Sequence, residues 1–214
     1  MPNKSRKGAA YVEFAISLLV LIPLLLGTIG IGLNMHMQLQ TVQLARDAGH
    51  MFARNIDFTL LGNQQVLSTV AGSLNLSTTA GKGNSVVILS TVQYMDLNAC
   101  TLAGMASGGQ PSGCTNYQKW VFTKRLVIGN SSIHSSNLGT PPASIVAADG
   151  SITIVNQATS TGAVAAVNGF NPWNSTNSTG LPSGQIVFVA EAAATGFHMP
   201  PYTQSTTTYA QTYF

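Results

Sequence analysis

The stretch KSRKGAAYVEFAISLLVLIPLLLGTIGIGL, residues 4–33, decides the fold of this chain. Its last 20 residues, 14–33, include no charged side chain. A helix of that length spans about 30 Å, the thickness of the hydrocarbon core of a bilayer. Pro23 interrupts the run, and because proline removes one helical hydrogen bond it predicts a kink in a membrane-spanning helix.

The basic residues of the chain are unevenly placed. Lys4, Arg6 and Lys7 precede the apolar run, and after Gly8 the chain has six basic and six acidic residues. The positive-inside rule therefore predicts a cytoplasmic N-terminus and an extracytoplasmic remainder. A cleaved secretory signal is one alternative, although its apolar region would be only about 7–15 residues long. A plain uncleaved anchor is another.

The composition of the chain is polar but nearly uncharged. Charged residues make up 7% of the sequence, whereas soluble domains have about 25%. Such a surface suits an exported or assembled protein better than a cytosolic enzyme. Because the part after Gly8 is formally neutral and has no basic stripe with interleaved aromatic residues, the sequence predicts no nucleic-acid binding.

The sequence has two cysteines, Cys100 and Cys114, with 13 residues between them. This spacing is too wide for a CxxC pair, and no further cysteine is present to complete a zinc site. In an oxidising compartment the two would close a disulfide that contributes about 3 kcal/mol in the chain-entropy model. Two free thiols are the alternative. We predict no metal site and no cofactor.

A helical pattern continues beyond the apolar run. Apolar or small residues recur at steps of three or four: Leu39, Val42, Ala45, Ala48 or Gly49, Phe52 and Ile56. One helix is therefore expected from about Ala10 to Phe58, with a length of roughly 70 Å. Its first half is apolar all round, and its amphipathic second half must pack on its own domain or on a neighbouring copy.

From residue 59 onward the sequence pattern changes from that of a long helix to one typical of strands and loops. One short helix is expected within residues 63–80 and a turn at 81–84. The β-like runs are residues 85–95, 119–129, 151–155 and 185–194. Long polar loops at 98–118, 130–150 and 156–184 separate them and read as surface decoration. The simplest architecture is an α+β domain in which the amphipathic helix lies on one face of an antiparallel sheet.

Candidates for catalysis are few. The histidines at positions 36, 50, 134 and 198 are scattered, and no nucleophile elbow, P-loop or zinc-protease motif occurs. We predict no catalytic site. An anchored extracytoplasmic enzyme would require His134, His198, Asp149 or Glu191 to cluster in one pocket. Glu191 lies in an apolar strand, where an edge or solvent-facing position is expected.

Glu13 is the only acidic residue among the first 46 residues, and it directly precedes the apolar run. The segment RKGAAYVEFAI resembles the processing site of type IV prepilins. GAAYVEFAISLLVLIPLLLGTIGIG followed by LQTVQLARDAGHMFAR resembles the TadE-like family of minor pilins (pseudopilins) of tight-adherence pilus systems. The resemblance covers roughly residues 6–55, and the rest of the chain shows no motif of that family.

The resemblance implies a pilin-like fold and a role in assembling an adhesion (Flp/Tad) pilus. A prepilin peptidase would cleave between Gly8 and Ala9, and the other partners would be pilins and the pilus assembly platform. Glu13 would neutralise the new α-ammonium in the same or a neighbouring subunit, because an unpaired charge there is costly. The alternative for Glu13 is a position at the membrane edge, where headgroups solvate it.

The expected division of the chain follows from these features. Residues 1–8 form the cytoplasmic leader, 9–33 the transmembrane helix, 34–58 its amphipathic continuation and 59–214 an extracytoplasmic α+β domain. The protein is expected in the bacterial inner membrane as a single-pass protein, and the resemblance also allows incorporation in a pilus. The alternative function is an unprocessed membrane-anchored surface protein or adhesin.

Overall fold

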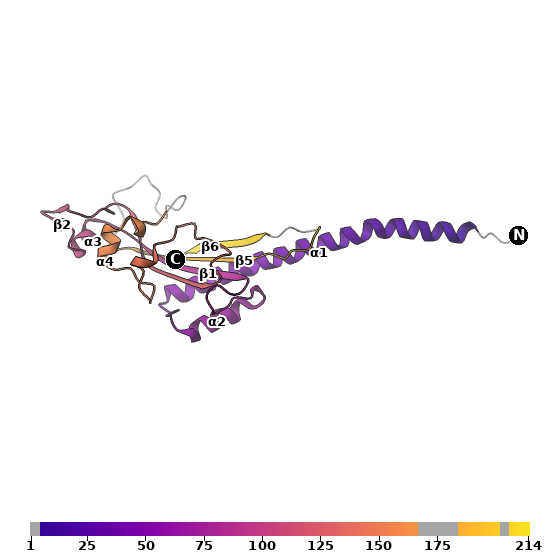
Figure 1. Cartoon of the computed structure of the whole chain (residues 1–214), viewed down its shortest axis with the longest axis horizontal. Helices are drawn as coiled ribbons and strands as arrows, with labels where there is room; N and C mark the ends of the chain where they lie inside the picture. Colours follow the sequence, from indigo (N-terminus) through magenta and orange to yellow (C-terminus); the bar gives the residue numbers. More distant parts are fainter. Residues whose placement is uncertain (1–4, 167–183, 202–205) are drawn as a thin grey trace.

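A computed structural model describes residues 5–166, 184–201 and 206–214. A single helix, α1 (Ser5–Ala53), runs through 49 residues, and its N-terminal part projects away from everything else (Figure 1). Its C-terminal part packs on a four-stranded antiparallel sheet. The predicted α+β architecture, with the long helix on one face of an antiparallel sheet, is confirmed.

The helix α1 ends five residues earlier than the sequence pattern predicts. Asn55 has a φ of 66°, a left-handed conformation that asparagine tolerates at a helix end. The amide of Ile56 donates to the carbonyl of Met51 (3.1 Å), and the amide of Asn55 donates to that of Phe52 (2.9 Å). These bonds satisfy carbonyls in the last turn and direct the chain into α2 (Leu61–Ala71), which η1 (Gly72–Leu74) extends.

The sheet has the order β4–β1–β5–β6, and each neighbouring pair is antiparallel. Its strands are β1 (Ser85–Tyr94), β4 (Trp120–Gly129), β5 (Ile186–Thr195) and β6 (Thr207–Tyr213). Three of them confirm predicted strands. The sequence analysis missed β6, because its residues TTYAQTY are mostly polar and lack the apolar alternation of a buried strand.

The main core lies between α1 and the sheet. Small residues dominate the contact: the helix presents Ala45 and Ala48, and β5 presents Ala190, Ala192 and Ala194. These small side chains let helix and sheet approach closely, while larger buried residues fill the surrounding space: Leu44, Phe52, Phe58, Leu67, Val87 and Leu89.

The buried stripe of α1 includes the predicted Ala45, Ala48 and Phe52 but not Leu39. Leu39 is 64% exposed, whereas Thr41 and Leu44 are buried. The packed face passes through Thr41, Leu44, Ala48 and Phe52, which places Leu39 on the opposite side of the helix. The prediction that Leu39 belongs to the buried stripe is wrong. A pattern based on hydrophobicity alone does not include a polar residue such as Thr41, which is the residue buried in this turn of the helix.

The second face of the sheet is covered by chain that follows β4. Ile133 packs near Val86 and Ile88, and Leu138 is buried in a cluster with Phe122 and others. The loop 130–150 is therefore the second layer of the core in this region rather than surface decoration. It includes η2 (Ala143–Ile145).

Short elements complete the end of the domain that lies farthest from the N-terminus (Figure 1). They are α3 (Leu97–Leu102), β2 (Ala106–Ser107), β3 (Gln110–Pro111), α4 (Ile154–Thr159) and η3 (Thr161–Ala163). The strand predicted at 151–155 is wrong. Ser151 and Ile152 form single bridges only, and the side chain of Thr153 caps α4 by accepting from the amide of Asn156. Residues 167–183 of the predicted loop 156–184 lie outside the described residues.

Candidate functional site

The N-terminal half of α1 exposes almost all of its large apolar side chains. Exposed fractions reach 75% at Tyr11 and Leu19 and remain 64% at Leu24. Within the helix, one stretch is apolar and long enough to cross a membrane. Water does not tolerate so much contiguous apolar surface on a monomer, whereas a bilayer matches it in length and chemistry. We therefore treat the protein as single-pass.

Glu13 lies exposed on α1, directly before the apolar run 14–33. Its backbone carbonyl accepts a hydrogen bond from the hydroxyl of Ser17 (2.9 Å). The ion pair found among the described side chains lies elsewhere, between Arg125 and Glu191.

The residues predicted for processing lie at the start of the same helix. Lys4 is outside the described residues, whereas Arg6, Lys7, Gly8 and Ala9 belong to the first turns of α1. Pro23 lies inside α1, which continues through it as one helix, so the kink stays a prediction. The helix thus includes Gly8, Ala9 and Glu13 in one continuous segment.

The structure brings Cys100 and Cys114 together. Their sulfur atoms are 2.00 Å apart and their Cα atoms 5.8 Å apart, which are disulfide distances. Cys100 lies on α3, whose first turn is capped by Asp96: the carboxylate accepts from the amide of Ala99 (2.8 Å). The pair fastens α3 to the segment that follows β3, at the far end of the domain.

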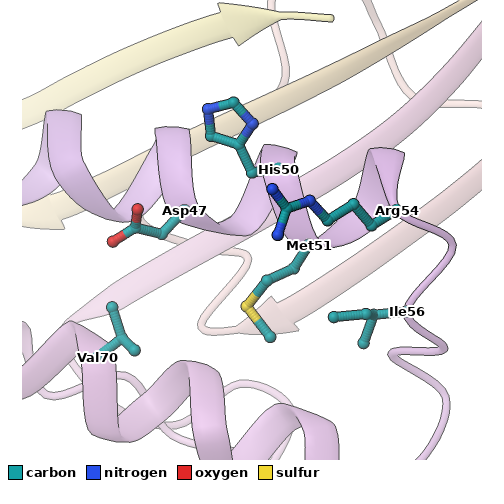
Figure 2. Close-up of a pocket in the computed structure, with 6 residues that line it drawn as sticks. All are labelled: Asp47, His50, Met51, Arg54, Ile56 and Val70. Atoms are coloured by element: carbon teal, nitrogen blue, oxygen red, sulfur yellow. The ribbon is translucent and has the colours of Figure 1, made fainter.

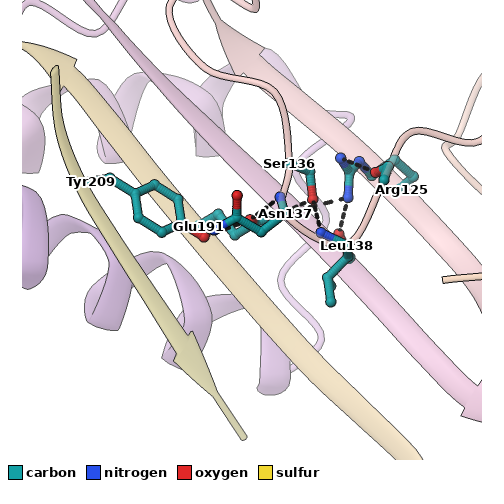
Figure 3. Close-up of polar contacts among 8 residues, drawn as sticks. Arg125, Ser136, Asn137, Leu138, Glu191 and Tyr209 are labelled. Carbon is teal, nitrogen blue, oxygen red and sulfur yellow. Dashed lines mark hydrogen bonds and ion pairs between the residues drawn. The ribbon is translucent and has the colours of Figure 1, made fainter. Parts of the chain in front are cut away.

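A buried polar network lies on the sheet face that the loop 130–150 covers (Figure 3). Glu191 of β5 is completely buried, and three groups donate to its carboxylate. These are the hydroxyl of Ser136, the amide of Asn137 (3.0 Å) and the hydroxyl of Tyr209 on β6 (2.7 Å). The expectation of an edge or solvent-facing position for Glu191 is therefore wrong.

Arg125 of β4 is the cation of this network. Its Nη1 donates to the hydroxyl of Ser90 (2.5 Å) and lies 3.9 Å from Oε2 of Glu191, while Nη2 donates to the carbonyl of Gly139 (3.0 Å). The guanidinium also lies over the ring of Phe122, with its central carbon 5.3 Å from the ring centroid. Both charges thus fasten the loop 136–139 to the sheet.

The electrostatics of the network follow from its burial. Burial lowers the pKa of Arg125 to about 10, and the nearby Glu191 carboxylate opposes this shift. The pKa of Tyr209 is raised, first by burial and then by its hydrogen bond to Glu191. The Glu191 carboxylate has three donors, and both terminal nitrogens of Arg125 have acceptors, whereas its buried Nε has none. These contacts identify the network as a clamp that holds the second layer on the sheet.

The residues required for an enzyme do not gather at one place. His134 stacks on Tyr209, with ring centroids 4.3 Å apart, and so lies near Glu191. Asp149, however, accepts hydrogen bonds from Ser151 in an exposed turn. His198 follows β5 seven residues beyond Glu191, roughly 20 Å along an extended chain. Among the described residues no cluster of three or more His, Cys, Asp or Glu side chains is placed to hold a metal ion.

A cavity of about 410 Å³ lies between the end of α1 and α2 (Figure 2). Asp47, His50 and Arg54 of α1 line it together with the apolar side chains of Met51, Ile56 and Val70. His50 also stacks on Phe214, with ring centroids 4.5 Å apart. The cavity combines three titratable groups on one helix face, without a nucleophile beside them.

Residues 8–50 match the family model of TadE-like protein. This confirms the resemblance seen in the sequence. The TadE-like segment begins at Gly8, includes Glu13 and Pro23, and ends three residues before the end of α1. It therefore coincides with the helix that spans the membrane and packs on the sheet. No curated protein and no solved structure matches the chain.

Sequence reasoning missed the clamp that lies outside the TadE-like segment. A signal for it was present: Glu191 stands in the run VFVAEAAA, where both alternating sets of residues are apolar. A strand with two apolar faces is buried on both sides, so its one acid must be buried as well. Its partner Arg125 had no such signal, because Thr123 and Lys124 directly precede it in the run KWVFTKRLVIG.

Proposed function

We propose that this protein is a minor pilin-like subunit (pseudopilin) that resembles TadE and assists assembly of a Flp/Tad adhesion pilus. The TadE-like family is associated with pili and is not an enzyme family. The observation that carries the proposal is that the family match covers the exposed apolar half of α1 together with its single acid, Glu13. In this proposal the chain sits in the bacterial inner membrane, with residues 1–8 cytoplasmic and the domain after α1 outside.

Processing gives the apolar helix its role. Cleavage between Gly8 and Ala9 by a prepilin peptidase removes Lys4, Arg6 and Lys7, the charges that hold the leader in the cytoplasm. It also creates an α-ammonium at Ala9, one helical turn from Glu13. Because an unpaired charge is costly in an apolar environment, the ammonium and the Glu13 carboxylate attract one another and fix the register between adjacent subunits. The partners are then other pilins and the pilus assembly platform.

The first test is the intact mass and N-terminal sequence of the membrane-extracted protein, made with and without its prepilin peptidase. We expect a chain that starts at Ala9 only when the peptidase is present. A Gly8→Lys variant should keep its leader in both samples. If the wild-type chain retains Lys4 to Lys7 in both, the protein is an unprocessed membrane-anchored surface protein or adhesin.

The role of Glu13 is tested separately. Glu13→Ala should insert in the membrane and be cleaved, but pilus formation should fall sharply because the ammonium at Ala9 loses its counter-charge. Ser17→Ala, one turn further along the same exposed helix, is the matched control and should assemble normally. Normal pilus formation by Glu13→Ala would show that the pairing role is wrong.

A further inference from the structure

The residues that directly follow β5, 196–201, lie beside α1 on the side toward its N-terminal half (Figure 1). Asn34 of α1 holds the first of these residues in place. The amide of Phe197 donates to Oδ1 of Asn34 (2.8 Å), and Nδ2 of Asn34 donates to the carbonyl of Phe197 (3.3 Å). Gly196 fits closely here, because a Cβ on it would lie 2.9 Å from Oδ1 of Asn34.

This attachment occurs at the end of the apolar run. Asn34 directly follows Leu33, the last residue of the 20-residue uncharged stretch. Gly30 lies four residues before Asn34, on the same face of the helix, and is buried, whereas Ile29 and Ile31 beside it are 48% and 57% exposed. The covered face of α1 therefore continues one turn into the apolar run, toward the membrane.

The residues that follow are suited to a membrane surface. Phe197, His198, Met199, Pro200 and Pro201 include no acidic, lysine or arginine side chain. His198, Pro200 and Pro201 are exposed, and Phe197 and Met199 are half-buried. Prolines have no amide proton, so two of them in a row reduce the number of donors that need water.

We propose that the segment Phe197–Pro201, the membrane-facing turn, enters the headgroup layer of the bilayer that α1 crosses. The protein then contacts the membrane at two points, the helix and this turn. Two contacts fix the rotation of the domain about the axis of α1, whereas a helix alone leaves it free to rotate. The proposal requires α1 to span a bilayer, but it does not require the pilus role.

Site-directed fluorescence tests this depth. The full chain carries a single environment-sensitive label on an introduced cysteine, with Cys100 and Cys114 left paired, and is placed one copy per lipid nanodisc. His198→Cys reports the membrane-facing turn. Ser107→Cys on β2, at the far end of the domain, is the aqueous control, and Leu21→Cys near the middle of the apolar run is the membrane control. The probe is a lipid with a quencher near its headgroup.

We expect the label at position 198 to emit at shorter wavelength than at 107 and to lose more emission to the quenching lipid. Water-like emission at 198 with no quenching overturns the proposal. Short-wavelength emission without lipid quenching also overturns it, because the turn is then covered by protein. If the label at 21 emits at the same wavelength as the aqueous control at 107, α1 does not span the bilayer and the proposal fails together with the membrane assignment. None of these outcomes depends on pilus assembly.

Discussion

At the scale of single residues, the buried pair Arg125 and Glu191 carries a large electrostatic cost. Moving each charged group from water into the protein interior costs roughly several kcal/mol of free energy, and only well-placed partners offset this cost. Glu191 has three donors and Arg125 has two acceptors and an aromatic ring. Since these partners come from β1, β6 and the loop 136–139, the pair joins elements that are distant in sequence.

Removing one charge of the pair is therefore expected to be costly. Glu191→Gln should lower the free energy of unfolding by about 3 kcal/mol, because Arg125 stays buried without a counter-charge. Denaturant unfolding of the detergent-solubilised full chain, followed by tryptophan fluorescence, measures it. Asp47→Asn, a change at an exposed acid on α1, should shift stability by less than about 0.5 kcal/mol.

A double-mutant cycle separates the pair from its neighbours. Arg125→Met combined with Glu191→Gln should cost less than the sum of the two single changes by at least about 1 kcal/mol, since no charge is then left unpaired. Strictly additive losses would mean that the two side chains act independently, and that Ser136, Asn137 and Tyr209 alone hold the carboxylate in place.

At the scale of elements, the contact between α1 and β5 depends on small side chains. Ala48→Leu should destabilise the domain by about 1–3 kcal/mol or more, because the larger side chain overpacks the space opposite Ala190 and Ala192. Arg46→Leu, on the exposed side of the same helix, is the control and should leave the unfolding midpoint nearly unchanged. If both variants change the unfolding midpoint by the same small amount, the space next to Ala48 is larger than in the structure, and the helix lies farther from the sheet.

The elements that sequence reasoning found are those with a clear hydrophobic period. The long helix and the strands β1, β4 and β5 have one, because each buries apolar side chains at regular positions. The polar seam between α1 and the β5–β6 pair has none. Thr41 and Thr208 share a hydrogen bond there (2.9 Å), and Gln38 donates to the carbonyl of Tyr209 (3.2 Å). Such pairing depends on which residues meet in three dimensions, so β6 was missed.

The features of the candidate site also fall into those that the sequence predicts and those that it does not. The membrane helix, Glu13 and the cysteine pair are local or compositional features, and the sequence was enough to predict where they lie along the chain. The clamp needed knowledge of what covers the second face of the sheet. That cover is the loop 130–150, whose polar composition resembles a solvent-exposed loop although Ile133, Ser136 and Leu138 pack inward.

At the scale of the whole molecule, α1 belongs to two environments. Its first half is exposed apolar surface, and its second half supplies Leu44, Ala45, Ala48 and Phe52 to the core of the domain. A boundary between the two is expected near Asn34, where the uncharged run ends and the bonds to the β5–β6 connection begin. The helix is thus an anchor and a structural layer at once, and its two functions can be separated experimentally.

Two truncations test that separation. A chain of residues 34–214 keeps every core residue of α1, so it should be monodisperse without detergent in size-exclusion chromatography and should show a cooperative unfolding transition. A chain of residues 59–214 loses the whole helix and exposes the apolar face formed by Val87, Leu89 and Ala192. It should aggregate, because that face then has no cover. Aggregation of residues 34–214 as well would mean that the domain has a second large apolar surface, and that the membrane or another subunit covers more than the first half of α1.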